Sequence, residues 1–160
     1  MTEKNLEINR ICPYFTRFPL QFPLLHLEAA HPGQWLLDPF CGSGTALFAA
    51  RVKGLNTVGV DASPVAVAIA RAKLRQVEFV AVVERAAHIL MTETTAPIPE
   101  GRFWERCYAP DVLDALCRLR AYFMRHRRDP VDTVLCALIL GLLHGQQKGG
   151  KIQCFSNHMP

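Results

Sequence analysis

Two short hydrophobic runs flank a glycine-rich turn in the first half of the chain. Residues 34–40 read QWLLDPF and residues 56–61 read NTVGVD, so each run is short, mostly apolar and contains an aspartate at or near its end. Apolar runs of this length, bounded by glycine or proline, are typical of strands buried inside a parallel sheet. We therefore expect a buried strand before the turn and a second strand after it.

A helical pattern follows each run. Residues 45–53 have helical spacing of their apolar positions, and Gly54 marks the stop. Pro64 suits the first turn of a second helix that extends to about Leu74. The order strand, turn, helix, strand, helix is typical of an α/β fold with parallel strands.

The pattern is mainly helical from Gln76 onward. Residues 77–91, 110–128 and 130–145 form three further helical segments. In the second of these, four apolar residues recur at spacings of three and four and predict one apolar face: Val112, Leu116, Leu119 and Phe123. Two strands alone do not complete a parallel sheet, so the fold is expected to be incomplete unless further strands have escaped recognition.

The bulk composition narrows the class of protein. A chain of 160 residues with 50% hydrophobic content is large enough to bury a core. The net charge of +4 suits a nucleic-acid partner and an ordinary basic enzyme equally. The six cysteines lack any C-x-x-C or zinc-type spacing, which predicts reduced thiols, no metal site and a cytoplasmic location. Residues 134–143 are too short an apolar run to span a membrane, so no membrane partner is expected.

The glycine-rich turn, residues 39–44 (PFCGSG), is the main candidate site. Gly42 and Gly44 allow a sharp turn and a close approach to a ligand, because no Cβ is in the way. The helix that follows points its free N–H groups toward the turn. Asp38 and Asp61 end the two strands, at the edge where open α/β sheets bind ligands. Because an acid there typically accepts hydrogen bonds from a ribose, we expect a cofactor that contains adenosine.

The turn differs from two common nucleotide-binding motifs. A dinucleotide fingerprint requires glycine or alanine where Leu47 stands, and a P-loop requires a Gly-Lys-Ser/Thr sequence that is absent. The structural alternative is an ordinary strand-to-helix turn, with Asp61 serving only as a helix cap.

The segment DPFCGSGT, residues 38–45, resembles motif I of S-adenosylmethionine-dependent methyltransferases, in particular those acting on adenine N6 or cytosine N4 of DNA. Residues 58–74 resemble the next motif, and residues 14–23 resemble the segment that covers the methionine end of the cofactor. The resemblance implies a Rossmann-like class I methyltransferase fold. Residues 1–75 would be its cofactor-binding part, and residues 76–160 a helical segment or insertion of the same domain.

The resemblance also implies S-adenosylmethionine as the cofactor and gives individual residues a role. The residues that would line it are Asp38, Phe40, Cys41, Gly42 and Gly44. Thr45 would cap or open the helix and Asp61 would bind the ribose. Thr16 and Arg17 would lie near the methionine carboxylate.

The catalytic motif of this family is missing. Methylation of a base amine requires acceptors for the N–H groups and an aromatic ring to hold the base, which the family supplies with an Asp/Asn/Ser-Pro-Pro-Tyr/Phe motif. No Pro-Pro occurs in the sequence, so no catalytic residue is assigned. We therefore expect an amino-terminal fragment that a carboxyl-terminal portion or a second chain would complete. The alternatives are an RNA guanine N2-methyltransferase, which carries a similar turn, and a noncatalytic or degenerate cofactor-binding subunit.

The expected partner is DNA, and a cluster of arginines within residues 118–128 offers contacts to its phosphates. The members of this arginine cluster are Arg118, Arg120, Arg125, Arg127 and Arg128. The alternative is a helix whose cations complement its negative end and face solvent.

Overall fold

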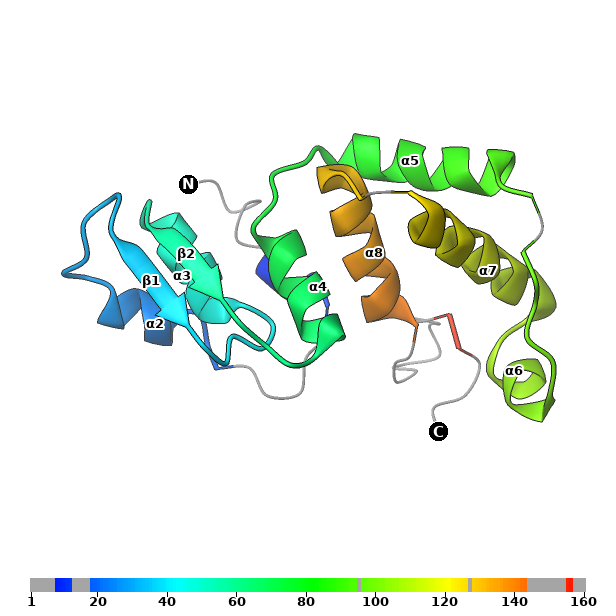
Figure 1. The fold of residues 1–160 in the computed structure, drawn as a ribbon, viewed down its shortest axis with the longest axis horizontal. Helices are drawn as coiled ribbons and strands as arrows, with labels where there is room; N and C mark the ends of the chain where they lie inside the picture. The colour runs from blue at the N-terminus through cyan, green and yellow to red at the C-terminus, as the bar shows by residue number, and fades with distance from the viewer. Residues whose placement is uncertain (1–7, 13–17, 95, 127, 144–154, 157–160) are drawn as a thin grey trace, which may run out of the picture. The chain divides into compact units, whose positions relative to one another are not determined.

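The computed structural model describes residues 8–12, 18–94, 96–126, 128–143 and 155–156. The chain divides into two compact units, residues 1–76 and 77–160. Figure 1 shows the order of the elements along the chain by colour.

The first unit is built around a small parallel sheet. Its elements are η1 (Ile8–Arg10), α2 (Gln21–His26), β1 (Trp35–Asp38), α3 (Thr45–Val52), β2 (Asn56–Gly59) and α4 (Pro64–Lys73). The register pairs Trp35 with Asn56 and Asp38 with Gly59. Figure 1 shows the two strands side by side, and α3 contacts both. The predicted α/β order is therefore confirmed, but the described residues contain only these two strands, and the complete Rossmann-like fold stays a prediction.

The boundaries of α3 and α4 follow from local backbone chemistry. Gly44 precedes α3 with a φ of 75°, and Gly54 follows it with a φ of 76°, a region that only glycine enters without strain. Ser63 caps α4, because its Oγ accepts a hydrogen bond from the N–H of Ala66. Pro64 then starts the helix with a favourable fixed φ.

One face of the sheet is covered and the other is open. Leu36 packs against a buried cluster that includes Leu47 of α3. Trp35 and Leu37 point to the opposite face, since side chains alternate along a strand, and they are 70% and 67% exposed. Leu37 is paired with Val58, which is also exposed. The expectation of a buried strand before the turn is therefore wrong for this face.

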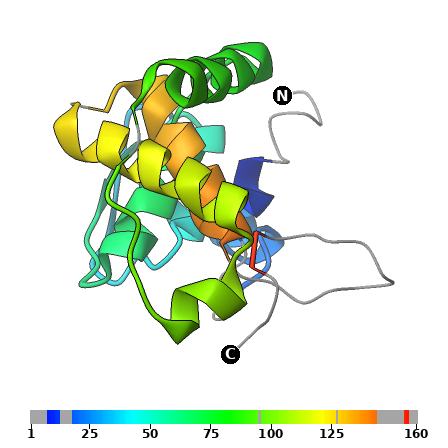
Figure 2. The ribbon, with the colours of Figure 1, turned by 90° about the vertical axis from the view of Figure 1, so that its right-hand side faces the viewer.

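The second unit is entirely helical in its described part. Its elements are α5 (Phe79–Thr92), α6 (Arg102–Cys107), α7 (Pro110–Arg125) and α8 (Pro130–Leu142). α5 contacts both α7 and α8, and it lies along the upper side of both in Figures 1 and 2. Cys107 and Tyr108 form a buried cluster with Leu113, so the end of α6 packs on the start of α7. The predicted helical character of this half is confirmed, with α6 as an additional helix.

None of the helices in the described ranges has the length and apolar character needed to cross a membrane. The described cysteines are free thiols: Cys12, Cys41, Cys107, Cys117 and Cys136. Across the same ranges, His, Cys, Asp and Glu side chains do not come together in groups of three that would hold a metal ion.

Candidate functional site

The glycine-rich turn leaves β1 and enters α3 through two residues with left-handed backbone conformation. Gly42 and Gly44 have φ angles of 50° and 75°, which residues with a Cβ rarely adopt. The N–H of Gly44 donates to the carbonyl of Cys41 at 2.7 Å and closes a tight turn. The backbone conformation itself therefore requires glycine at both positions.

Asp61 connects this turn to the second strand. Its Oδ2 accepts a hydrogen bond from the N–H of Gly42 at 2.8 Å, and its Oδ1 accepts one from the N–H of Ser63 at 2.8 Å. An ionised carboxylate offers about four acceptor positions, so two backbone bonds leave capacity for a ligand hydroxyl. Because Ser63 is the N-cap of α4, Asp61 is not merely the cap of that helix.

Asp38 and Phe40 stand at the other side of the same edge. The Oδ1 of Asp38 accepts a hydrogen bond from the N–H of Phe40 at 3.1 Å, which orients the start of the turn. Asp38 is half-buried, whereas the Phe40 side chain is 89% exposed. So large an exposed aromatic ring beside the turn has most of its surface available to bury against a ligand.

Helix α4 supports the turn from its inner side. A Cβ on Gly44 would lie 2.8 Å from the Cβ of Ala70, so the turn and the helix touch without room for any side chain. The Nζ of Lys73 donates to the Oγ of Ser43 at 3.2 Å, and Lys73 is fully buried. Ala70 and Lys73 are three residues apart and share one helix face. That spacing was visible in the sequence, but the part both residues play at the turn was not predicted.

Cys41 faces the interior. Its side chain packs with Leu47 and Ala70, and a Cβ on Gly59 would lie 3.1 Å from its Sγ. Burial raises the pKa of the Cys41 thiol, and the charges of Asp38 and Asp61 raise it further, so the group stays protonated. The Cys41 side chain is therefore an uncharged and mostly buried group.

Of the remaining predicted residues, Thr45 is described by the structure, whereas Thr16 and Arg17 are not. Thr45 is buried and is the first residue of α3, and its neighbour Gly44 occupies the N-cap without a side-chain cap. Thr45 therefore opens the helix rather than capping it. Thr16 and Arg17 lie outside the described residues, so their proposed position near a carboxylate stays a prediction.

The arginine cluster of the second unit consists of residues with different partners. Arg118 pairs with Asp114 at 2.7 Å and also donates to the carbonyl of Leu90. Arg125 pairs with Glu93. These two arginines are engaged by their own unit. Figure 2 shows α7, which carries them, in yellow-green.

Arg120 and Arg128 of the same cluster line a pocket instead. The guanidinium of Arg128 lies 5.4 Å from the centre of the Phe123 ring, a cation–π distance. Arg127 lies outside the described residues. Two described members of the cluster therefore form ion pairs and two others line the pocket, and contact of the cluster with DNA stays a prediction.

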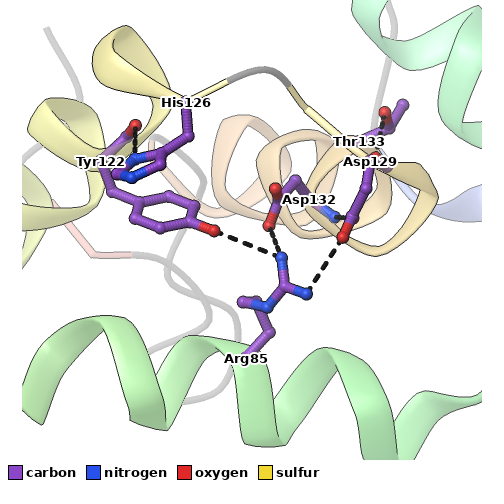
Figure 3. Close-up of polar contacts among 6 residues, drawn as sticks. All are labelled: Arg85, Tyr122, His126, Asp129, Asp132 and Thr133. Atoms are coloured by element: carbon purple, nitrogen blue, oxygen red, sulfur yellow. Dashed lines mark hydrogen bonds and ion pairs between the residues drawn. The ribbon is translucent and has the colours of Figure 1, made fainter. Parts of the chain in front are cut away.

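A second polar network was not predicted from the sequence (Figure 3). Arg85 of α5 contacts Asp132 at 2.5 Å, Asp129 at 3.0 Å and the hydroxyl of Tyr122 at 3.3 Å. Asp132 is almost fully buried, and its N–H donates to the Oδ1 of Asp129, the N-cap of α8. The network joins α5, α7 and α8, so it is a structural feature that holds the helical unit together.

The charges in this network reinforce one another. Burial alone would lower the pKa of Arg85, but the hydrogen bonds to Asp129 and Asp132 outweigh it and raise that pKa. Burial alone would raise the pKa of Asp129, yet the N–H of Asp132 and the guanidinium of Arg85 bring it below its usual value. The ionised forms of both partners are therefore favoured in the folded state.

Comparisons with known proteins bear on the first unit. Residues 2–72 match the DNA methylase family. The Type II methyltransferase M.MjaII of Methanocaldococcus jannaschii is 34% identical over 78 residues, which are 48% of this chain and 15% of that protein. The matched segment is thus a small part of the relative's length, and no solved structure matches the chain significantly. Over residues 2–72, which contain the glycine-rich turn and both strands, this chain is similar to the DNA methylase family.

Proposed function

We propose that this chain supplies the S-adenosylmethionine-binding part of a DNA methyltransferase that modifies adenine N6 or cytosine N4. The observation that carries the proposal is the hydrogen bond between Asp61 and Gly42, which brings the ends of both strands together at one edge. The match to the DNA methylase family supports DNA as the substrate.

The residues at this edge fit such a cofactor. The carboxylates of Asp38 and Asp61 accept hydrogen bonds from the turn, α3 begins directly after it, and the turn carries the exposed ring of Phe40. Asp61 would accept hydrogen bonds from the ribose hydroxyls, with Gly42 holding its carboxylate in place. Asp38 places a negative charge where the positively charged methionine end would lie. S-adenosylmethionine, when bound, would supply a methyl group activated by its sulfonium.

The groups that act on the acceptor base are not recognisable in these 160 residues. The sequence holds no Pro-Pro-aromatic motif of the kind that binds the acceptor amine in this family. Cofactor contacts position the methyl donor but do not by themselves stabilise the transition state selectively. We infer that the acceptor-binding groups come from outside this sequence.

A noncatalytic cofactor-binding subunit is the second candidate, and the missing acceptor motif is the observation that favours it. An RNA guanine N2-methyltransferase would share the D-P-x-C-G-S-G turn, but the family match favours DNA.

Calorimetric titration tests the proposed cofactor. The purified chain is titrated with S-adenosylhomocysteine, and in parallel with ATP and with NAD. We expect saturable binding of S-adenosylhomocysteine and none of the other two at equal concentration. No binding of S-adenosylhomocysteine, or equal binding of all three ligands, contradicts the proposal.

A further inference from the structure

The helical unit contains a pocket of about 850 Å³. Aromatic side chains form much of its apolar wall: Phe103, Trp104, Tyr108 and Phe123. Trp104 and Tyr108 are stacked, with their ring planes at 23°. The volume lies within the range of pockets that bind small ligands, and aromatic faces are the surfaces on which flat rings stack.

The charge of the pocket has one sign. Arg120 and Arg128 are its charged lining residues, and no carboxylate is found among the side chains that line it in the described part of the chain. Both arginines are exposed, so their guanidinium groups can reach a ligand in solvent. Aromatic walls with cations and no acids are complementary to a ligand that has a flat ring and an adjacent anion.

Ion pairs in the same unit show which arginines of α7 remain available to a ligand. Arg118 and Arg125 belong to the same helix, but Asp114 and Glu93 neutralise them. They are also absent from the pocket lining. Among the described arginines of α7 and the segment after it, the two that do not pair with Asp114 or Glu93 therefore both line the pocket.

We propose that this pocket binds one unstacked nucleotide of a DNA strand. The base stacks against the aromatic wall, and the phosphates on either side of it contact Arg120 and Arg128. The inference rests on the proposed function, because that function supplies DNA as the partner. All residues of the pocket belong to residues 77–160, whereas the cofactor turn belongs to residues 1–76.

Tryptophan fluorescence provides a direct test. The chain has two tryptophans, Trp35 in the sheet and Trp104 in the pocket. A Trp35→Phe background leaves Trp104 as the single reporter of the pocket. This protein is titrated at low salt with a short single-stranded oligodeoxynucleotide, and we expect a saturable change in Trp104 emission.

Substitutions then separate the pocket from general electrostatic attraction. Arg120→Gln and Arg128→Gln should each weaken binding about tenfold, as expected for a lost charged hydrogen bond. Each should also lower the salt dependence of binding by about one phosphate contact. Phe123→Leu should weaken binding without changing that salt dependence, because it removes only the stacking surface. Arg118→Gln is the matched control: it removes an equal charge from the same helix and should have a much smaller effect.

Several results would overturn the inference. Binding of the oligonucleotide without any change in Trp104 emission would place the binding site outside the pocket. A loss of affinity in Arg118→Gln equal to that in Arg120→Gln or Arg128→Gln would show that only the net charge of the protein matters. Binding of deoxyadenosine monophosphate as tightly as the strand would assign the pocket to a free nucleotide. Binding of an acidic amphipathic peptide in place of the strand would assign it to a protein partner.

A parallel titration with S-adenosylhomocysteine keeps the two proposals distinct. Cofactor binding without oligonucleotide binding at Trp104 overturns the pocket assignment and leaves the proposed function standing. Oligonucleotide binding at Trp104 without cofactor binding overturns the proposed function instead. Circular dichroism of each variant confirms that the helices are retained.

Discussion

The carboxylate of Asp61 lies 2.8 Å from the backbone nitrogen of Gly42, 19 residues earlier in the chain. The acid at the end of β2 therefore fixes the turn that follows β1. Asp61 thus shapes the turn, and we propose that its remaining acceptor positions bind a ligand. Asp61 and the turn lie at the edge of the sheet where open α/β folds bind ligands.

Replacing Asp61 with alanine tests this double role. Asp61→Ala should weaken the binding of S-adenosylhomocysteine by ~1–3 kcal/mol, the size of a lost hydrogen bond to a charged group. Calorimetry measures the affinity. Asp111→Ala is the control, because it removes an exposed carboxylate from the first turn of α7 in the other unit. Equal affinities of parent and Asp61→Ala would reduce Asp61 to a structural role.

Alanine substitutions at two glycines with similar φ angles distinguish the cost of backbone strain from the cost of steric overlap. Gly33 and Gly44 have φ angles of 88° and 75°, but a Cβ on Gly33 meets nothing within 4 Å, whereas one on Gly44 would lie 2.8 Å from Ala70. Gly33→Ala should cost roughly 1–2 kcal/mol of unfolding free energy from the positive φ alone. Gly44→Ala should cost about 1–3 kcal/mol more, because overlap is added.

Urea unfolding followed by Trp35 emission measures both glycine variants. A Trp104→Phe background makes Trp35 the single tryptophan, so the signal reports the first unit. Equal losses of stability in Gly33→Ala and Gly44→Ala would mean that α4 moves aside easily and does not support the turn tightly.

Removal of Asp132 should destabilise the helical unit strongly. The carboxylate is 2% exposed and pairs with Arg85, and breaking a buried pair by removing one partner costs roughly 3 kcal/mol or more. Asp129→Ala should cost less, about 1 kcal/mol, because that side chain is 43% exposed and acts mainly as a helix cap. Thermal unfolding monitored by circular dichroism ranks the two variants, and the reverse order would contradict this view of the network.

The same network predicts sensitivity to acid. The pKa of Asp129 is lower in the folded protein than its ordinary value of 3.8. A group of this kind contributes stability that is fully present above its unfolded pKa and is lost as the pH falls through the folded pKa. The urea midpoint of the helical unit should therefore decrease below about pH 4. Asp129→Asn should flatten that part of the profile, and an unchanged slope would remove Asp129 as its source.

The chain by itself should bind the cofactor without methylating DNA. It contains the turn but no recognisable acceptor motif, and binding of the donor alone does not lower the barrier for transfer. Incubation with radiolabelled S-adenosylmethionine and mixed-sequence DNA measures transfer. Incorporation of label above a protein-free background would show that acceptor groups are present among these residues after all.

The sequence predicted the first unit well because its elements carry explicit boundary signals. Gly54 ends α3 and Pro64 begins α4 in the structure, as expected from their fixed or unusual φ preferences. The open face of the sheet was not predicted, since an apolar strand such as residues 35–38 indicates a preference for burial but not the element that covers it. Helix α6 is only six residues long, too short for a periodic pattern to identify.

The sequence predicted which residues of the candidate site lie at the ends of the strands, but not the contacts between helices. Asp38, Gly42, Gly44 and Asp61 are indeed close along one edge, because parallel strands bring their ends together. The pairing of Arg118 with Asp114 was visible as a spacing of four, but the pairing of Arg125 with Glu93 spans 32 residues. Contacts of that kind depend on how helices pack, which local pattern does not determine.

The support of the turn by α4 has a consequence for the order in which the protein forms. Asp61, Ala70 and Lys73 all come later in the sequence than the turn they hold. A chain emerging during synthesis therefore contains the complete glycine sequence before it contains the groups that shape it. The turn reaches its final conformation only after α4 has docked, so the shortest piece with a preformed binding edge must extend through Lys73.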